Sequence, residues 1–254
     1  MTRQVRARKP RLFEPPAGLE FENALFDHLT ETASPPFADI FFWHQKKCLV
    51  LPRRWTEKPG FEVAAESAMS GGWPIFPRRS GGSCVFHGQN VLCITSILCT
   101  ERHQLGIRDV YTRFCNLVID SLKNLYGVEA RYGGCPDAPC DGDFNILIGQ
   151  RKLAGTAMRR RSTHGKDTFL VHGVIWLEEP LQEPLCVIEA FDRAMGLDVH
   201  YPPEACITLQ EAAGDVAGGS ELGILLDKLT EAHADYMLSS RVIPPSTTSD
   251  SPVI

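Results

Sequence analysis

Short apolar runs that are typical of β-strands recur along this chain without a helix between each pair. They cover residues 40–44, 48–51, 75–78, 84–87 and 91–98, and the first two are expected to pair with each other. A parallel sheet would need a regular alternation of strands and helices, which this order lacks. The sequence therefore predicts an α+β fold with a mixed, largely antiparallel sheet flanked by helices.

Helical periodicity marks other segments of the chain. In residues 107–126, apolar side chains recur at helical spacing over about five turns. Four further helices are expected, at residues 19–32, 62–70, 183–198 and 221–239.

The remaining regular structure is predicted to be a β-hairpin and one more strand. The hairpin joins residues 144–148 to 152–158 through a short turn, and the strand covers 169–176. Residues 133–142 are rich in glycine and proline, and we expect an irregular loop there.

The length and composition of the chain predict one large domain. Residues 18–239 of the 254 are expected to form a single catalytic domain. Residues 1–17 are basic and contain proline, which predicts a flexible arm, and the Ser-, Thr- and Pro-rich residues 240–254 predict a disordered tail.

Charge and cysteine content argue against several classes of protein. The net charge of −5 gives no reason to expect a nucleic-acid partner. No apolar run approaches the ~20 residues that span a bilayer, and no secretory signal is present, so we expect a cytoplasmic monomer away from membranes. The nine cysteines have no framework spacing and are expected to be reduced, mostly as core residues. Cys48, Cys93, Cys99 and Cys186 lie in apolar runs that predict core strands.

A glycine-rich turn bounded by arginines lies in the segment PRRSGGSCVFHG, residues 77–88. Gly81 and Gly82 allow the backbone to approach a ligand and to present N–H groups to an anion. Arg78 or Arg79 could add a fixed charge for a carboxylate or a phosphate. The alternative is an ordinary glycine turn between two strands with exposed arginines.

A lysine precedes a run of small residues in the segment RKLAGTAMRR, residues 151–160. Small side chains at Gly155, Thr156 and Ala157 would leave a slot for an elongated apolar ligand. Lys152 beside that slot could stabilise an oxyanion or a thiolate. The alternative is a surface lysine on a hairpin.

Cys140 lies in the irregular loop just upstream of this lysine. A thiol beside Lys152 would have a lowered pKa and would be a competent nucleophile. An inert loop cysteine, Cys135 as the nucleophile, and a metal pair of Cys135 with Cys140 are alternatives. No second Cys/His pair with ligand spacing follows, so no metal is predicted. His172 is either a core histidine with one hydrogen bond or a wall residue of the pocket.

Together these segments resemble the biotin/lipoate protein ligase family over roughly residues 38–180. Arg-Arg-Ser-Gly-Gly followed by Val85-Phe86-His87-Gly88 is similar to the ligand-binding motif of lipoate ligases and octanoyltransferases. Lys-Leu-Ala-Gly-Thr-Ala at 152–157 is similar to the lysine motif of that family. A short strand at 144–147 precedes it, and His172-Gly173 falls where many members have a His-Gly strand.

The resemblance implies an acyltransferase with a biotin/lipoate ligase-like catalytic domain. Cys140-Asp141-Gly142 resembles the Cys-Pro-Gly loop of the cysteine-dependent octanoyl and lipoyl transferases, which implies catalysis by Cys140 and Lys152. The implied partners are acyl carrier protein and lipoyl-domain or H-type carrier proteins, and the implied reaction moves an octanoyl or lipoyl group to a carrier lysine without a cofactor. The implied substrate-binding residues are Arg78, Arg79, Ser80, Gly81, Gly82, Ser83, Val85, His87, Gly155, Thr156, Ala157 and His172.

Two departures from the family pattern leave other functions open. Ser83 and Cys84 replace the usual third glycine and small residue, and Gln89-Asn90 replaces a common glycine-containing turn. One alternative is an ATP-dependent lipoate-protein ligase, which would use ATP and Mg²⁺. Another is a non-catalytic binder of acylated carrier proteins.

Overall fold

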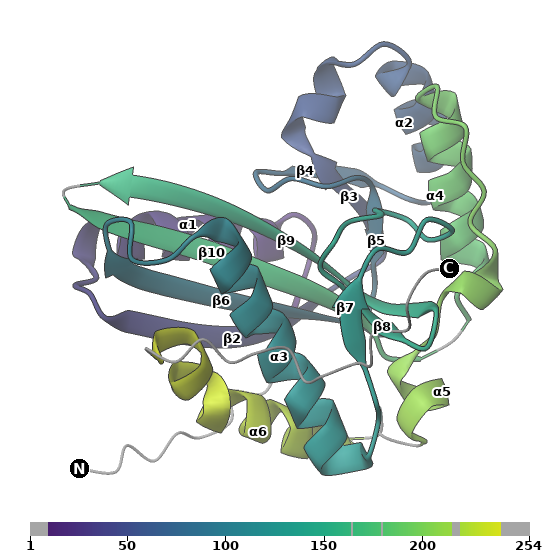
Figure 1. Cartoon of the computed structure of the whole chain (residues 1–254). Helices are drawn as coiled ribbons and strands as arrows, with labels where there is room; N and C mark the ends of the chain where they lie inside the picture. Colours follow the sequence, from purple (N-terminus) through teal and green to yellow (C-terminus); the bar gives the residue numbers. More distant parts are fainter. Residues whose placement is uncertain (1–9, 164, 179, 215–218, 240–254) are drawn as a thin grey trace, which may run out of the picture.

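The computed structural model describes residues 10–163, 165–178, 180–214 and 219–239, and its main feature is a seven-stranded sheet (Figure 1). β1 pairs with β2 in parallel, and the other neighbouring strands are antiparallel. The predicted α+β fold is therefore confirmed, and the predicted hairpin is β8–β9. In order across the sheet, the strands are β1 (Arg11–Phe13), β2 (Phe37–Gln45), β6 (Val91–Glu101), β10 (Lys166–Trp176), β9 (Arg151–Thr163), β8 (Asn145–Ile148) and β7 (Arg131–Gly133).

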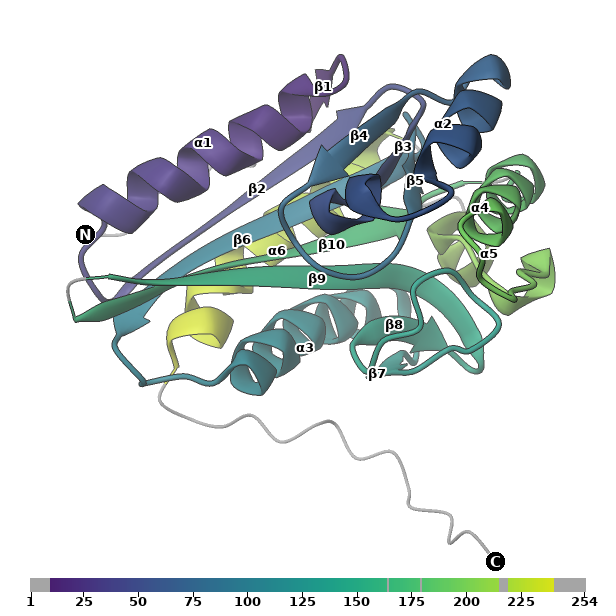
Figure 2. The same ribbon diagram turned by 90° about the horizontal axis from the view of Figure 1, so that it is seen from above.

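A second sheet of three strands stands beside one end of the first (Figure 1). Its central strand β3 (Cys48–Pro52) is parallel to β4 (Ile75–Arg78) and antiparallel to β5 (Val85–His87). The short helical turn η1 (Arg53–Glu57) and helix α2 (Phe61–Ser70) connect β3 to β4. The turn between β4 and β5, which carries the glycine-rich segment, extends over β9 (Figures 1 and 2).

Helices cover both faces of the large sheet (Figure 2). Helix α1 (Ala17–Thr32) lies along one face, and α3 (Ile107–Tyr126) and α6 (Gly219–Leu238) lie along the other. The remaining helical segments are α4 (Gln182–Ala194), which packs against α2, and the short η2 (Pro203–Ala205) and α5 (Leu209–Ala213).

Helix α3 has the bounds that its sequence predicts, because both ends carry local stop signals. The Gly106 N–H donates to the Asp109 carboxylate at 2.7 Å, which closes the first turn. Gly127 follows the last turn at φ +66°, a conformation that favours glycine and ends the helix. Between these ends, Phe114 and Leu117 belong to the buried face that packs into the main core.

The predicted pairing of residues 40–44 with 48–51 is wrong. The first segment belongs to β2 and pairs with β1 and β6, whereas the second belongs to β3 in the other sheet. All residues of β3 are buried. A strand of this kind needs a partner on each edge and cover on each face, and the centre of the small sheet supplies both.

Cysteine burial follows the prediction with one exception. Cys48, Cys93 and Cys99 are buried in strands. Cys186 is exposed on α4, so its assignment to a core strand is wrong. The apolar residues around it are spaced for one face of a helix, and Cys186 lies off that face.

The ends of the domain differ from the prediction where they can be described. Arg11–Phe13, within the predicted flexible arm, forms β1 and pairs with the edge of β2. The predicted arm residues 1–9 and the predicted tail 240–254 lie outside the described residues. None of the helices in the described part of the chain combines the length and the apolar character that a bilayer span requires.

Candidate active site

An apolar cavity lies between the large sheet, α1 and the small sheet. Trp43, Val174 and Trp176 contribute apolar walls. The predicted site residues that line the cavity are Arg78, Val85, His87, Cys140, Lys152, Gly155, Thr156, Ala157 and His172.

A second hollow lies on the other side of Cys140, and we call it the groove. It is lined by Gly81 and Gly82, by Tyr111 of α3, by residues 140–145, and by Thr156 and Ala157. Cys140, Thr156 and Ala157 belong to both linings. Residues 141–143 on the rim of the groove are exposed to solvent. Cys140 therefore separates an apolar cavity from a solvent-facing groove.

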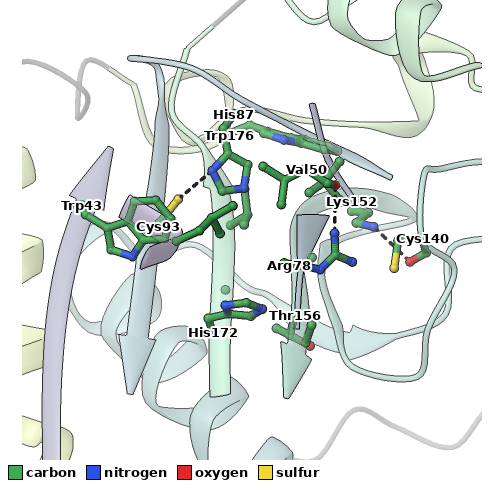
Figure 3. Close-up of a pocket in the computed structure, with 16 residues that line it drawn as sticks. Trp43, Val50, Arg78, His87, Cys93, Cys140, Lys152, Thr156, His172 and Trp176 are labelled. Atoms are coloured by element: carbon green, nitrogen blue, oxygen red, sulfur yellow. Dashed lines mark hydrogen bonds between the residues drawn. The ribbon is translucent and has the colours of Figure 1, made fainter. Parts of the chain in front are cut away.

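Lys152 is buried and holds the loop that carries Cys140 (Figure 3). Its Nζ donates to the carbonyl oxygens of Pro139 and, at 3.1 Å, Cys140. Burial lowers the pKa of Lys152, and the nearby Cys140 opposes that shift because a thiolate favours the ammonium form. The predicted neighbourhood of Lys152 and Cys140 is thus present in the structure.

Asn145 fixes the same loop from the start of β8. Its Nδ2 donates to the carbonyl oxygens of Cys140 and Gly142, each at 3.0 Å. Cys140 itself has φ +62°, a left-handed conformation that few side-chain-bearing residues adopt. The two side-chain donors, Asn145 and Lys152, compensate for that cost and set the direction of the thiol. Asn145 had no predicted role, although an amide two residues after a Gly-Asp turn is a signal for such a bond.

The thiol of Cys140 has a lowered pKa. Burial alone would raise it, but the Lys152 ammonium, the Ser83 N–H and the Arg78 guanidinium outweigh that effect. The Ser83 N–H donates to Sγ of Cys140 at 3.3 Å. This is the environment of a reactive cysteine rather than of an inert loop cysteine.

Cys135, the alternative nucleophile, has a different environment. Its thiol is buried and donates to the carbonyl oxygens of Gln150 and Ala205, and burial raises its pKa. Burial also raises the pKa of each of these other cysteines: Cys48, Cys84, Cys93, Cys99, Cys115 and Cys206. The electrostatics therefore favour Cys140 over Cys135.

Alkylation should reveal the lowered pKa directly. In a Cys186→Ser background, which removes the exposed thiol, we expect iodoacetamide to modify Cys140 with a pH midpoint below the ~8.5 of a free cysteine. The rate should rise through that midpoint because the thiolate is the reacting form. The measurement is the rate of mass increase against pH, and Cys140→Ser in the same background is the control. A midpoint at or above that of free cysteine would contradict the prediction.

The glycine-rich turn is shaped by Arg78 rather than left free for a ligand. The buried guanidinium donates to the carbonyl oxygens of Val50 at 2.9 Å, Gly81 at 2.6 Å and Ser83 at 2.8 Å. Gly82 has φ +97°, and a Cβ there would lie 2.8 Å from Arg78 Nη2 and 2.9 Å from Cys140 Sγ. The turn can therefore approach the thiol closely only with glycine at this position.

Other predicted residues of this turn lie apart from the cavity. Arg79 points to solvent and pairs with Asp27 of α1, and it lines neither the cavity nor the groove. Ser80 is buried behind the cavity wall, and Ser83 reaches the site through its backbone N–H. Arg79 is thus not brought to the predicted pocket, because its neighbour Arg78 turns inward and adjacent residues of an extended chain point in opposite directions.

A buried chain of hydrogen bonds supports the cavity wall at His172. Its Nδ1 lies 3.0 Å from a Glu22 oxygen, and its Nε2 lies 2.9 Å from Ser80 Oγ. The Thr95 hydroxyl also donates to Glu22 at 2.7 Å. Burial would raise the pKa of Glu22, but the interactions with His172 and Thr95 lower it overall, so the carboxylate is ionised and accepts from Nδ1.

His172 is therefore a cavity wall residue with two polar partners, not a core histidine with one. Glu22 is a residue that the sequence analysis missed. The sequence signal for such a residue is an acidic side chain on the apolar, buried face of a helix, here α1, where a charge requires a partner. Through Ser80, the chain of bonds joins α1 and β10 to the glycine-rich turn.

Removal of Glu22 should destabilise the fold. We expect Glu22→Ala to lower the free energy of unfolding by about 3 kcal/mol, because His172 and Thr95 would lose a buried charged partner. Urea denaturation measures the change. Glu20→Ala, at an exposed position of the same helix, is the control and should change stability by less than about 0.5 kcal/mol. Equal effects of the two variants would contradict the prediction.

The far wall of the cavity is closed by neutral groups (Figure 3). Nδ1 of His87 lies 3.4 Å from the Cys93 thiol, beside the ring of Trp43. Burial lowers the pKa of His87 to about 3, so the ring carries no charge at neutral pH.

Within the described residues, no group of three or more His, Cys, Asp or Glu side chains could hold a metal ion.

Comparisons with known proteins agree on one family. A sequence model of the lipoyl protein ligase A/B catalytic domain matches residues 14–193. An uncharacterised protein of Cupriavidus necator is 29% identical over 67% of this chain and 72% of its own length. An octanoyl-GcvH:protein N-octanoyltransferase of Kyrpidia tusciae is 27% identical over 61% of this chain. The matched region spans about half of that transferase, 55% of its length.

Solved structures agree on the fold. The bipartite lipoate protein ligase of Thermoplasma acidophilum superposes with a TM-score of 0.62 at 15% identity, covering 90% of this chain and 84% of that one. A lipoate-protein ligase A bound with ATP gives a TM-score of 0.54 at 17% identity, covering 86% of this chain and 100% of that one. At these identities the likeness concerns the fold alone.

Proposed function

This chain belongs to the lipoyl protein ligase A/B catalytic domain family, and from that premise we propose that it transfers an octanoyl or lipoyl group to a carrier lysine through a Cys140 thioester. The matched relative from Kyrpidia tusciae is named as an N-octanoyltransferase that acts on octanoyl-GcvH, which supports carriers of the H type as partners. The proposed reaction needs no ATP and no metal.

The observation that carries this proposal is the position of Cys140. Its thiol has a lowered pKa and lies between the apolar cavity and the groove. An acyl chain in the cavity would be shielded from water while its carbonyl carbon stays beside the sulfur. The groove would admit the carrier that gives or receives the chain.

In the first step, the Cys140 thiolate attacks the acyl carbon of the donor. A carbon–sulfur bond to Cys140 forms, the bond from the acyl carbon to the donor thiol or amine breaks, and the leaving group takes a proton from the Lys152 ammonium. Lys152 is the charged group that most lowers the pKa of Cys140, and with the Ser83 N–H it stabilises charge at the reacting centre.

In the second step, the uncharged amine of the acceptor lysine attacks the thioester. A carbon–nitrogen bond forms, the carbon–sulfur bond breaks, and Cys140 leaves as a thiolate whose pKa is already lowered. Lys152, left uncharged by the first step, takes up the proton that the attacking amine releases and returns to the ammonium form. Burial lowers the pKa of Lys152, which helps its side chain to donate a proton in the first step and to accept one in the second.

Intact-mass measurement tests the proposal. Incubation with octanoyl-acyl carrier protein, or with an octanoylated H-type protein, should add one octanoyl group to the chain. We expect the adduct to be absent in Cys140→Ser and present in Cys135→Ser. An adduct that persists in Cys140→Ser would remove Cys140 from the proposed role. Pyrophosphate release from ATP and lipoate that does not depend on Cys140 would instead support a lipoate-protein ligase.

A further inference from the structure

Three arginines that the proposed chemistry does not use gather around one carboxylate of α1, and we call Arg79, Arg159 and Arg161 the guanidinium patch. Arg79 Nη1 lies 3.1 Å from one Asp27 oxygen, and Arg161 Nη2 lies 2.9 Å from the other. The guanidinium of Arg159 stacks 4.1 Å from the centre of the Phe26 ring. A single carboxylate thus serves two guanidinium groups and has a third beside it.

The positive charge of the patch is not balanced locally. Nη2 of Arg159 is buried and has no hydrogen-bond partner among the described residues, so this arginine adds charge to the patch rather than an accessible donor. The other carboxylate near Arg159 is Glu22, which already accepts hydrogen bonds from His172 and Thr95. The chain as a whole carries a net charge of −5, so this excess of positive charge is a local feature rather than a general one.

Two of the three arginines are also accessible to solvent. The side chains of Arg79 and Arg161 are 48% and 42% exposed, and Asp27 is 37% exposed. Side chains exposed to this extent can pair with groups on another protein, and guanidinium groups bind carboxylates with two parallel hydrogen bonds.

The patch continues the face of β9 that lines the cavity. Alternate residues of a strand share a face, so Arg159 and Arg161 follow Gly155 and Ala157 on the same side of β9. At about 3.3 Å per residue, Gly155 and Arg161 are roughly 20 Å apart along the strand. Arg79 belongs to the same turn as Gly81 and Gly82, which line the groove. A protein that presents an acyl chain at the groove would therefore extend over the patch.

We propose that the guanidinium patch binds acidic side chains on the carrier protein next to the group that enters the groove. This inference rests on the proposed function for the identity of the partner, but not for the existence of the surface. Arg79 and Arg161 present exposed guanidinium groups with the half-buried charge of Arg159 beside them, which fits a protein surface bearing several carboxylates. Asp27 occupies part of the patch in the free protein and limits its charge.

Two opposite changes to the same ion pairs separate docking from a structural role. Arg79→Gln with Arg161→Gln removes positive charge, and Asp27→Asn removes the competing carboxylate. Both break the contacts to Asp27, so a purely structural role predicts the same direction of effect in both. Docking predicts that the double arginine variant binds the carrier about tenfold more weakly and that Asp27→Asn binds it more tightly.

The measurement is fluorescence anisotropy of a labelled H-type carrier protein, titrated with each variant at low and at physiological ionic strength. Salt should weaken binding by the native chain more than by the double variant, because exposed charge pairs are screened. Lys123→Gln, an exposed position at the end of α3, is the matched control and should bind as the native chain does. Binding is measured without turnover, so the result does not depend on Cys140.

Parallel acylation assays distinguish the two proposals. S-octanoyl-N-acetylcysteamine, which carries no carrier protein, should acylate Cys140 equally in all variants. If it fails to acylate the native chain, the proposed function is wrong, whereas the anisotropy result still decides the docking surface. Carrier binding that is unchanged in the double arginine variant, or that falls in Asp27→Asn as well, would overturn the docking surface alone.

Discussion

Replacing Lys152 with methionine is expected to slow acylation of Cys140 by about 100- to 1000-fold. Methionine keeps the length and apolar character of the lysine stem but has no charge. The thiol of Cys140 would then keep the burial that raises its pKa and lose the ammonium that most strongly lowers it. Single-turnover adduct formation measures the rate, and the pH dependence of alkylation should move upward in the same variant.

The joint change in rate and pKa distinguishes catalysis from simple loss of structure. The carbonyl oxygens of Pro139 and Cys140 would lose a donor, so some loss of stability is also expected. Lys123→Met, at an exposed site, is the control for the substitution itself. If Lys152→Met acylates within about tenfold of the native rate, Lys152 is not the group that activates the thiol.

The substitution Gly82→Ala is expected to lower the rate of Cys140 acylation about a hundredfold. Its Cβ would lie 2.8 Å from Arg78 Nη2 and 2.9 Å from Cys140 Sγ, at a backbone φ of +97°. The turn or the thiol has to move, and the Ser83 N–H that donates to Sγ moves with the turn. The strained conformation itself should cost about 1–3 kcal/mol in the free energy of unfolding.

The neighbouring glycine provides a matched control for this variant. A Cβ at Gly81 would meet no atom within 4 Å. Gly81→Ala should therefore acylate at nearly the native rate, although it adds the same methyl group one residue away. Equal losses in the two variants would show that the turn needs flexibility rather than close contact with the thiol.

Local signals made much of the fold predictable from the sequence. Helix α3 is bounded by Gly106 and Gly127, and its apolar spacing needs no tertiary information. The β8–β9 hairpin follows from two short runs around a glycine turn. The sequence could not place β3, because nothing local distinguishes a hairpin partner of β2 from the centre of a second sheet.

The candidate site was predictable where the motif itself supplies the group. Cys140 and Lys152 fall in segments that resemble the family, and the structure brings both to the cavity lining. The supporting residues were harder to predict, because Glu22 contacts His172 from a helix 150 positions away in the sequence. Arg79 was assigned to the site together with Arg78, and only the backbone direction shows that the two point to opposite sides.

The position of one sulfur between the cavity and the groove has a consequence for the order of events. Under the proposed mechanism, the donor and the acceptor would reach the same atom from the groove, so they could not occupy it together. Between the two transfers the protein would hold the acyl chain without a carrier, and the apolar cavity would shield that chain from water. Such a protein would need to bind only one carrier at a time, and a single docking surface could bind the donor and the acceptor in turn.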